Sequence, residues 1–125
     1  MWVTAEEMKQ RVGIISERTK FYGRENKKIA IGAEIITSLA KTDAEARSNS
    51  LATVMGGHKT YERELTTEGY MKRSLIGGPH EVLKQVEAFV SAGVTHFELR
   101  PVYSSIDQLV EMMSLWSKEI LPVYA

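Results

Sequence analysis

The feature that most constrains this fold is a nearly unbroken apolar run, IAIGAEII, at residues 29–36. Runs of this kind are typical of strands that are buried on both faces of a parallel sheet. We therefore predict a strand at 28–36. Side-chain alternation places Ile29, Ile31, Ala33 and Ile35 on one face. The other face is smaller and carries a carboxylate, with Ala30, Gly32, Glu34 and Ile36.

Helices are predicted before and after this strand from their end signals. Capping-box spacing at Thr4 with Glu7, and again at Thr42 with Glu45, starts helices at 4–22 and from 42 to about 54. Gly23 supplies a left-handed cap for the first of them. The segment 58–72 is polar and poorly periodic, and we expect a loop there with at most a short helix.

The second half of the chain repeats the alternation. Short strands are predicted at 73–77 and 95–99. Between them Pro79 opens a helix that Gly93 closes. A last helix runs from Ser105 to Pro122, and its expected apolar face is Ile106, Leu109, Val110, Met113, Trp116 and Ile120. A helix followed by three strand–helix units predicts parallel pairing through right-handed crossovers.

Composition excludes several classes of function. Sixteen basic residues balance sixteen acidic ones, which argues against binding to nucleic acid or to a membrane surface. The absence of cysteine excludes disulfides and thiolate chemistry. No apolar run approaches the roughly 20 residues of a membrane span, and no secretion signal is visible. We expect one cytoplasmic domain covering residues 1–125.

Four segments together resemble the luciferase-like monooxygenase family, which includes bacterial luciferase and F420-dependent oxidoreductases. They are TDAEAR at 42–47, SLIGGPHEV at 74–82, FVSAGVTHFEL at 89–99 and EILPVY at 119–124. The resemblance covers only the C-terminal part of the family's barrel. It implies a partial TIM-type barrel with three parallel strands and four helices, and FMN or F420 as cofactor. A complete barrel takes about 250 residues.

The best candidate for a binding site is the turn Gly77-Gly78-Pro79-His80. Helix N-termini favour anions, and glycine lets a ligand approach the backbone. Phosphate sites in barrels often involve the loops after strands seven and eight, and the resemblance places this turn after strand seven. We expect Gly77, Gly78 and His80 to face a cofactor phosphate. The alternative is a tight strand-to-helix turn that needs glycine for its own conformation.

Arg100 is the second candidate, because it ends the third strand where barrel sites lie. It could contact an anion or substrate. Alternatively it forms an internal ion pair, and Glu34 could approach Arg100 or Glu98. The three histidines lack metal-ligand spacing, so no metal is expected. We expect His80 to be exposed and His96 to be a hydrogen-bonded interior residue.

Three parallel strands leave two open edges and a face that stays partly uncovered, with Ile36, Ile76, Glu34 and Glu98. Open edges pair readily with other chains, so we expect a homo-oligomer, or a partner chain that supplies the missing strands. The leading functional hypothesis is a segment of a flavin-dependent oxidoreductase that is inactive alone. The alternatives are a non-catalytic, oligomerising module with an anion or small-ligand site, and an unrelated α/β binding domain.

Overall fold

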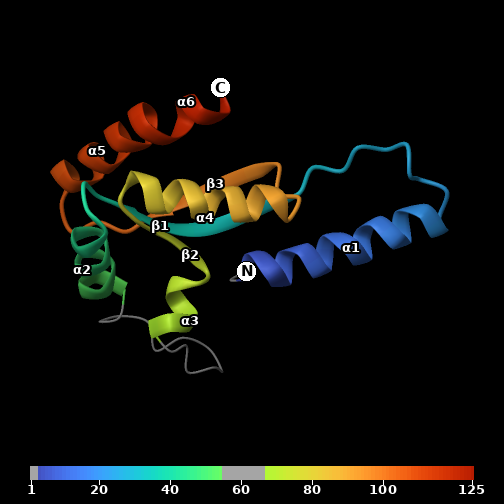
Figure 1. Ribbon diagram of the computed structural model, residues 1–125, viewed down its shortest axis with the longest axis horizontal. Coiled ribbons are helices and arrows are strands. Elements are labelled where there is room, and N and C mark those ends of the chain that lie inside the picture. The colour runs from blue at the N-terminus through green and yellow to red at the C-terminus, as the bar shows by residue number, and fades with distance from the viewer. Residues whose placement is uncertain (1–2, 55–66) are drawn as a thin grey trace.

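The computed structural model describes residues 3–54 and 67–125. Helices and strands alternate along these residues, as predicted (Figure 1). In chain order the elements are α1 (Ala5–Phe21), β1 (Gly32–Leu39), α2 (Asp43–Val54), α3 (Thr67–Met71), β2 (Ser74–Gly77), α4 (Pro79–Ser91), β3 (His96–Pro101), α5 (Ile106–Leu115), the π-helical turn η1 (Trp116–Ile120) and α6 (Leu121–Tyr124). The short helix α3 falls within the expected loop; His58 and the Gly56-Gly57 pair lie outside the described residues.

The sheet is parallel, with strand order β2-β1-β3. β3 pairs with residues Gly32 to Thr37 of β1. β2 pairs with the C-terminal half of β1, so that Leu39 of β1 lies opposite Gly77 of β2. The α/β class with three parallel strands is confirmed. Consecutive strands of a barrel wall would follow chain order, whereas here β1 is central. β1 suits that position because residues 35–39 are all buried, as expected for a strand whose two faces are both covered by helices.

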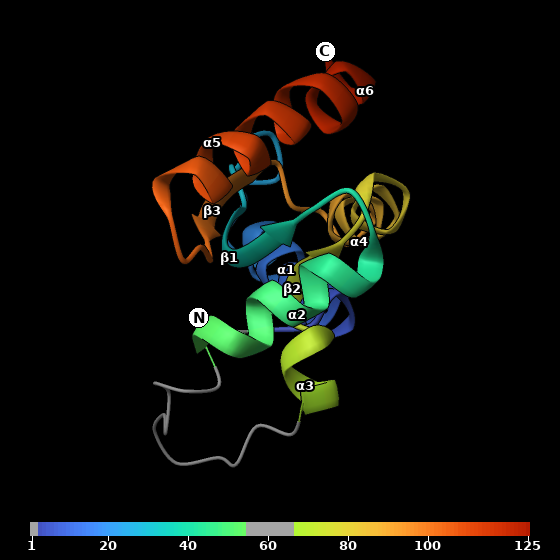
Figure 2. The same ribbon diagram turned by 90° about the vertical axis from the view of Figure 1, so that its left-hand side faces the viewer.

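Helices cover both faces of this sheet (Figure 2). Ala33, Ile35 and Leu39 pack with α4, α5 and η1 in one core cluster. On the opposite face Ile36 and Ile76 pack with Ala46 of α2 and Tyr70 of α3. The expectation of a partly open face was therefore wrong for Ile36 and Ile76, which are 5% and 1% exposed, because α2 and α3 fold over them. Towards the start of β1, Glu34 on that face is exposed.

β1 begins later than predicted, at Gly32, and continues to Leu39. The carbonyl of Ile31 accepts hydrogen bonds from the backbone amides of Thr95 and His96, which marks where pairing with β3 starts. Residues 28–30 precede that point and are exposed. Their apolar character resembled a strand, but no neighbouring strand reaches them.

The last helix packs through only part of the predicted face. Met112, Trp116 and Ile120 are buried, and their spacing of four aligns them on one side of the helix. Ile106, Val110 and Met113 are exposed. The predicted face therefore combined two sides of the helix, of which this chain covers only one.

The first helix is capped as predicted but packs along only part of its length. Thr4 and Glu7 form the complete capping box, and Gly23 has a φ of 63°. Ala5 and Met8 pack against the core, and Val12 contacts Gly93. Phe21 is 76% exposed, so the C-terminal end of this helix does not pack against the core. Across the described residues, no helix combines the length and apolar character needed to cross a membrane.

Candidate functional site

The predicted glycine turn lies at the C-terminal edge of the sheet, where β1 and β2 lead into helices. The amide of Ala40 donates to the carbonyl of Gly77 at 3.3 Å, which holds the two strand ends together. Gly77 is buried, and a Cβ there would lie 2.8 Å from the Cβ of Glu81. Only glycine therefore fits where β2 turns into α4. His80 is exposed in the first turn of α4, as predicted.

The N-terminus of α4 already has an anionic partner within the chain. Gly78 is its N-cap, and the Gly78 amide donates to the Oδ1 atom of Asp43 at 2.7 Å. A carboxylate is stabilised at this position by the helix dipole. Asp43 is the first residue of α2, so this contact links two helices on opposite faces of the sheet. A phosphate at the Gly78 amide would have to displace Asp43.

Arg100 forms an ion pair with Glu34, as the sequence offered as an alternative, but the pair is exposed rather than internal. Its Nη1 atom lies 3.0 Å from Oε1 of Glu34, and the two side chains are 59% and 41% exposed. Solvent at this exposure screens much of the attraction, so the pair contributes little to stability. Arg100 keeps enough exposed surface to contact a further anion.

The structure does not bring Arg100 and the glycine turn into one site. Arg100 is on β3 and Gly77 on β2, with β1 between them. Two strand spacings of about 4.8 Å separate them across the sheet. Arg100 also pairs with Ile36, three residues before Leu39, the partner of Gly77. One phosphate cannot contact both positions.

The histidines do not assemble into a site. His96 is exposed on β3, which corrects the prediction of an interior residue. It lies at the start of an edge strand, where the described chain places no helix over it. Among residues 3–54 and 67–125, no three His, Asp or Glu side chains are grouped so that they could hold a metal ion.

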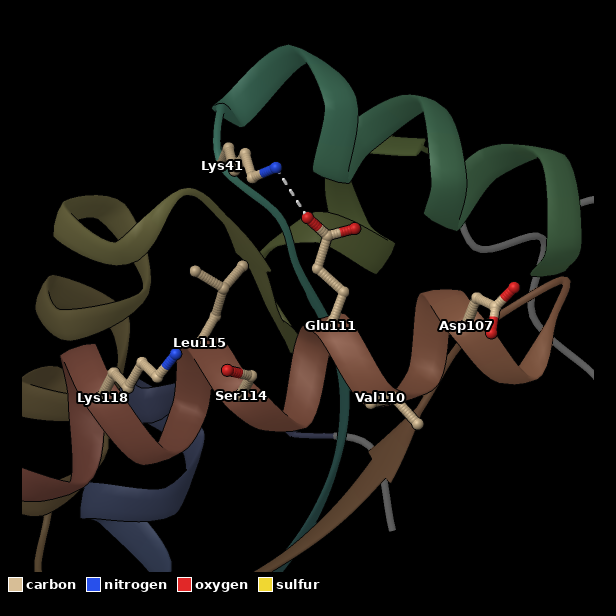
Figure 3. Close-up of a pocket in the computed structure, with 7 residues that line it drawn as sticks. All are labelled: Lys41, Asp107, Val110, Glu111, Ser114, Leu115 and Lys118. Carbon is tan, nitrogen blue, oxygen red and sulfur yellow. Dashed lines mark ion pairs between the residues drawn. The ribbon is translucent and has the colours of Figure 1, made fainter.

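A groove that the sequence did not indicate lies between α5 and the loop after β1 (Figure 3). Nζ of Lys41 lies 2.8 Å from Oε1 of Glu111 across it, and this hydrogen bond raises the pKa of Lys41. The groove has a volume of about 460 Å³ and is lined by Lys41, Asp107, Val110, Glu111, Ser114, Leu115 and Lys118. The available signal was the position of Lys41 just after the C-terminal end of a strand.

No protein-family model and no curated protein matches the sequence. Solved structures do match. Monooxygenase RslO1 from Streptomyces bottropensis superimposes with a TM-score of 0.71 at 16% identity, over 97% of this chain and 39% of that one. An F420-dependent secondary alcohol dehydrogenase gives 0.69 at 16% identity, over 98% of this chain and 41% of that one. The coenzyme F420 dependent tetrahydromethanopterin reductase from Methanopyrus kandleri gives 0.65 at 17% identity, over 98% and 43%.

These matches define the fold class. The chain has an α/β fold that forms part of luciferase-like TIM-barrel proteins. It spans about two fifths of the length of these three structures. The resemblance noted in the sequence is thus confirmed for the fold, whereas identities of 16–17% carry no information on activity.

The residues at the glycine turn do not fit a flavin phosphate in the conformation described. The Gly78 amide is bonded to Asp43, which carries the same sign of charge as the phosphate. The Glu34 carboxylate likewise engages Arg100.

Proposed function

We propose that this chain forms the C-terminal part of the barrel of a flavin-dependent, luciferase-like oxidoreductase, and that these residues alone do not carry out its redox reaction. The observation that carries the proposal is the shared fold. The three superpositions cover 97–98% of this chain, and two of the matched structures are named for F420. A complete active site would require strands beyond those described, from the same polypeptide or from another one.

In this proposal the chain contributes contacts to the anionic part of FMN or F420. Gly77 and Gly78 offer backbone at a helix N-terminus, His80 lies in the first turn of α4, and Arg100 is a separate, exposed cation. The bound cofactor would supply hydride or oxygen-activation chemistry. The residues of this chain would only bind and orient it, after Asp43 moves away from Gly78.

The test is titration of the ¹⁵N-labelled chain with FMN, F420 and inorganic phosphate, followed by NMR and visible absorbance. We expect the amide signals of Gly77 and Gly78 to shift, and Asp43→Ala to strengthen binding because it frees the Gly78 amide. Glu45→Ala removes the same charge from the same helix and should not strengthen binding. Absence of any shift at Gly78 in Asp43→Ala would overturn cofactor contact at this turn.

A second candidate is a non-catalytic, oligomerising α/β module. Two observations favour it: Asp43 satisfies the Gly78 amide at 2.7 Å, and Glu34 pairs with Arg100 at 3.0 Å. Groups that are satisfied internally need no ligand. Unchanged flavin spectra with both the wild type and Asp43→Ala would favour this candidate over the first.

A further inference from the structure

The two edges of the sheet differ in how their backbone groups are satisfied. At the β2 edge, the amide of Ile76 donates to Oε1 of Gln85 at 2.8 Å, and Nε2 of Gln85 donates to the carbonyl of Ile76 at 3.0 Å. The Gln85 side chain thus takes the place of a neighbouring strand. It blocks the pairing by which exposed edges recruit other chains.

The β3 edge has no such protection within the described chain. None of the residues of β3 is fully buried, and β3 pairs with β1 alone. The amides of His96 and Val102 donate to carbonyls of Ile31 and Thr37, at the two ends of the pairing with β1. Backbone groups alternate in direction along a strand, so the N–H and C=O groups of Phe97 and Leu99 point to the free edge.

The helix beside this edge has an exposed apolar flank. Ile106, Val110 and Met113 of α5 are 67%, 58% and 61% exposed. Their spacing of i, i+4 and i+7 aligns them along one side of the helix. In Figure 2, α5 lies towards the β3 side of the sheet and α4 towards the β2 side of the same face. Val110 also lines the groove that holds Lys41 and Glu111, and Figure 3 shows its side chain pointing away from that ion pair.

The free edge of β3 and the apolar flank of α5 together form one exposed surface. Charges on β3 indicate what binds to it. Arg100 pairs with Glu34, while Glu98, opposite Glu34 in the sheet, makes no ion pair or side-chain hydrogen bond with any described residue. In an antiparallel pair of β3 strands centred on Leu99, Glu98 of one copy lies opposite Arg100 of the other. Cross-strand pairs of opposite charge are stabilising. The edge is therefore complementary to itself.

We propose that this surface binds a second copy of the chain about a two-fold axis perpendicular to the sheet. Leu99 then exchanges both backbone hydrogen bonds with Leu99 of the second copy. The Phe97 amide donates to the Pro101 carbonyl of that copy. The axis keeps both α5 helices on one face, where their apolar flanks pack together. The net charge of zero adds no repulsion between copies.

Other self-pairings are disfavoured by the same residues. A register centred on Glu98 would set two carboxylates directly opposite each other, which is destabilising. Head-to-tail pairing of β3 with β2 is prevented because Gln85 already occupies the β2 edge. The pairing centred on Leu99 satisfies both the charges and the backbone groups.

The test is sedimentation equilibrium of the full chain over a range of micromolar concentrations. We expect a wild-type dimer and at least tenfold weaker association for Glu98→Arg, which places two cations opposite each other. Adding Arg100→Glu to Glu98→Arg should restore association, because the opposite charges face each other again. Val110→Lys should also dissociate the dimer, whereas Val90→Lys, a matched substitution at an exposed valine of α4, should not.

Circular dichroism of each variant separates loss of association from loss of folding. A wild-type chain that is monomeric at every concentration would overturn the proposal. So would a charge-swapped variant that associates no better than Glu98→Arg. The proposal does not depend on flavin binding, so its failure and that of the proposed function are read from different measurements.

Discussion

At the scale of single residues, Asp43 stabilises a helix to which it does not belong. Its carboxylate accepts a hydrogen bond from the N-cap amide of α4 while it occupies the first turn of α2. Hydrogen bonds to charged groups contribute more than neutral ones, about 1.5–3 kcal/mol. The contact therefore joins the two layers of helices through one side chain.

We predict that Asp43→Ala lowers the free energy of unfolding by about 1–2 kcal/mol, since the Gly78 amide loses its charged acceptor. Urea denaturation followed by circular dichroism measures the change. Glu45→Ala, two residues further along α2, should change stability by less than about 0.5 kcal/mol, as surface substitutions usually do. If both variants lose the same free energy of unfolding, the hydrogen bond from Gly78 to Asp43 does not stabilise the fold more than an ordinary surface charge does.

The carboxylate of Glu7 should contribute to the loss of stability of the fold at acid pH. Its carboxylate accepts from the Thr4 amide at 2.7 Å and from Arg73 at 3.0 Å. The Thr4 amide, with a smaller contribution from Arg73, lowers the pKa of Glu7 below its usual value of 4.5. Its stabilisation is therefore complete above pH 4.5 and is lost as the pH falls through the lower folded pKa.

Glu7→Gln should destabilise the protein at neutral pH and make stability fall less steeply below pH 4.5. Urea midpoints measured from pH 3 to 7 test this prediction. Glu6→Gln removes the same charge from the exposed neighbouring position and should leave the acid response close to that of the wild type. If the stability of Glu7→Gln falls with pH as steeply as that of the wild type, the acid response comes from other groups.

At the scale of elements, the sequence predicted helix starts well because caps are local. Thr4, Thr42 and Ser105 each accept the expected backbone hydrogen bond three residues on. Strand limits were less predictable, since Ile29 is as apolar as Ile35 yet lies before the pairing begins. Strand order was not predictable from local patterns, because which strand becomes central depends on tertiary pairing.

The elements should also differ in local stability. α1 has no buried residue, whereas residues 35–39 of β1 are all buried. We therefore expect amides at 13–22 to exchange with solvent at least about a hundredfold faster than those of β1, because little packing opposes their opening. Hydrogen exchange followed by mass spectrometry measures this. Slow exchange throughout α1 would mean that another surface covers its C-terminal end.

At the scale of the whole molecule, the sequence correctly indicated that the glycine turn and Arg100 lie towards the C-terminal side of parallel strands. It could not indicate that Asp43, 35 residues before Gly78, occupies the amide. Nor could it show that β1 separates the two candidates. Both facts depend on contacts between distant segments, and composition, caps and periodicity carry no information about these.

Gln85 leads to a prediction for the assembled state. Gln85→Ala removes both hydrogen bonds to Ile76, and should leave the amide and carbonyl of Ile76 without partners at the β2 edge. We expect species larger than the wild type to form as concentration rises, and light scattering after size-exclusion chromatography detects them. Lys84→Ala, at the adjacent exposed position of α4, should behave as the wild type. Unchanged size in Gln85→Ala would mean that the surrounding helices suffice to protect this edge.

The closed β2 edge also limits growth. A subunit with two adhesive ends adds copies without end and forms fibres, whereas one with a single adhesive end that matches itself stops at a pair. In the proposed dimer, one glutamine side chain, lying against one residue of a four-residue strand, would thus separate a finite particle from an open polymer. Since β3 is the strand that remains exposed, that difference would decide whether the chain stays in solution when it is concentrated.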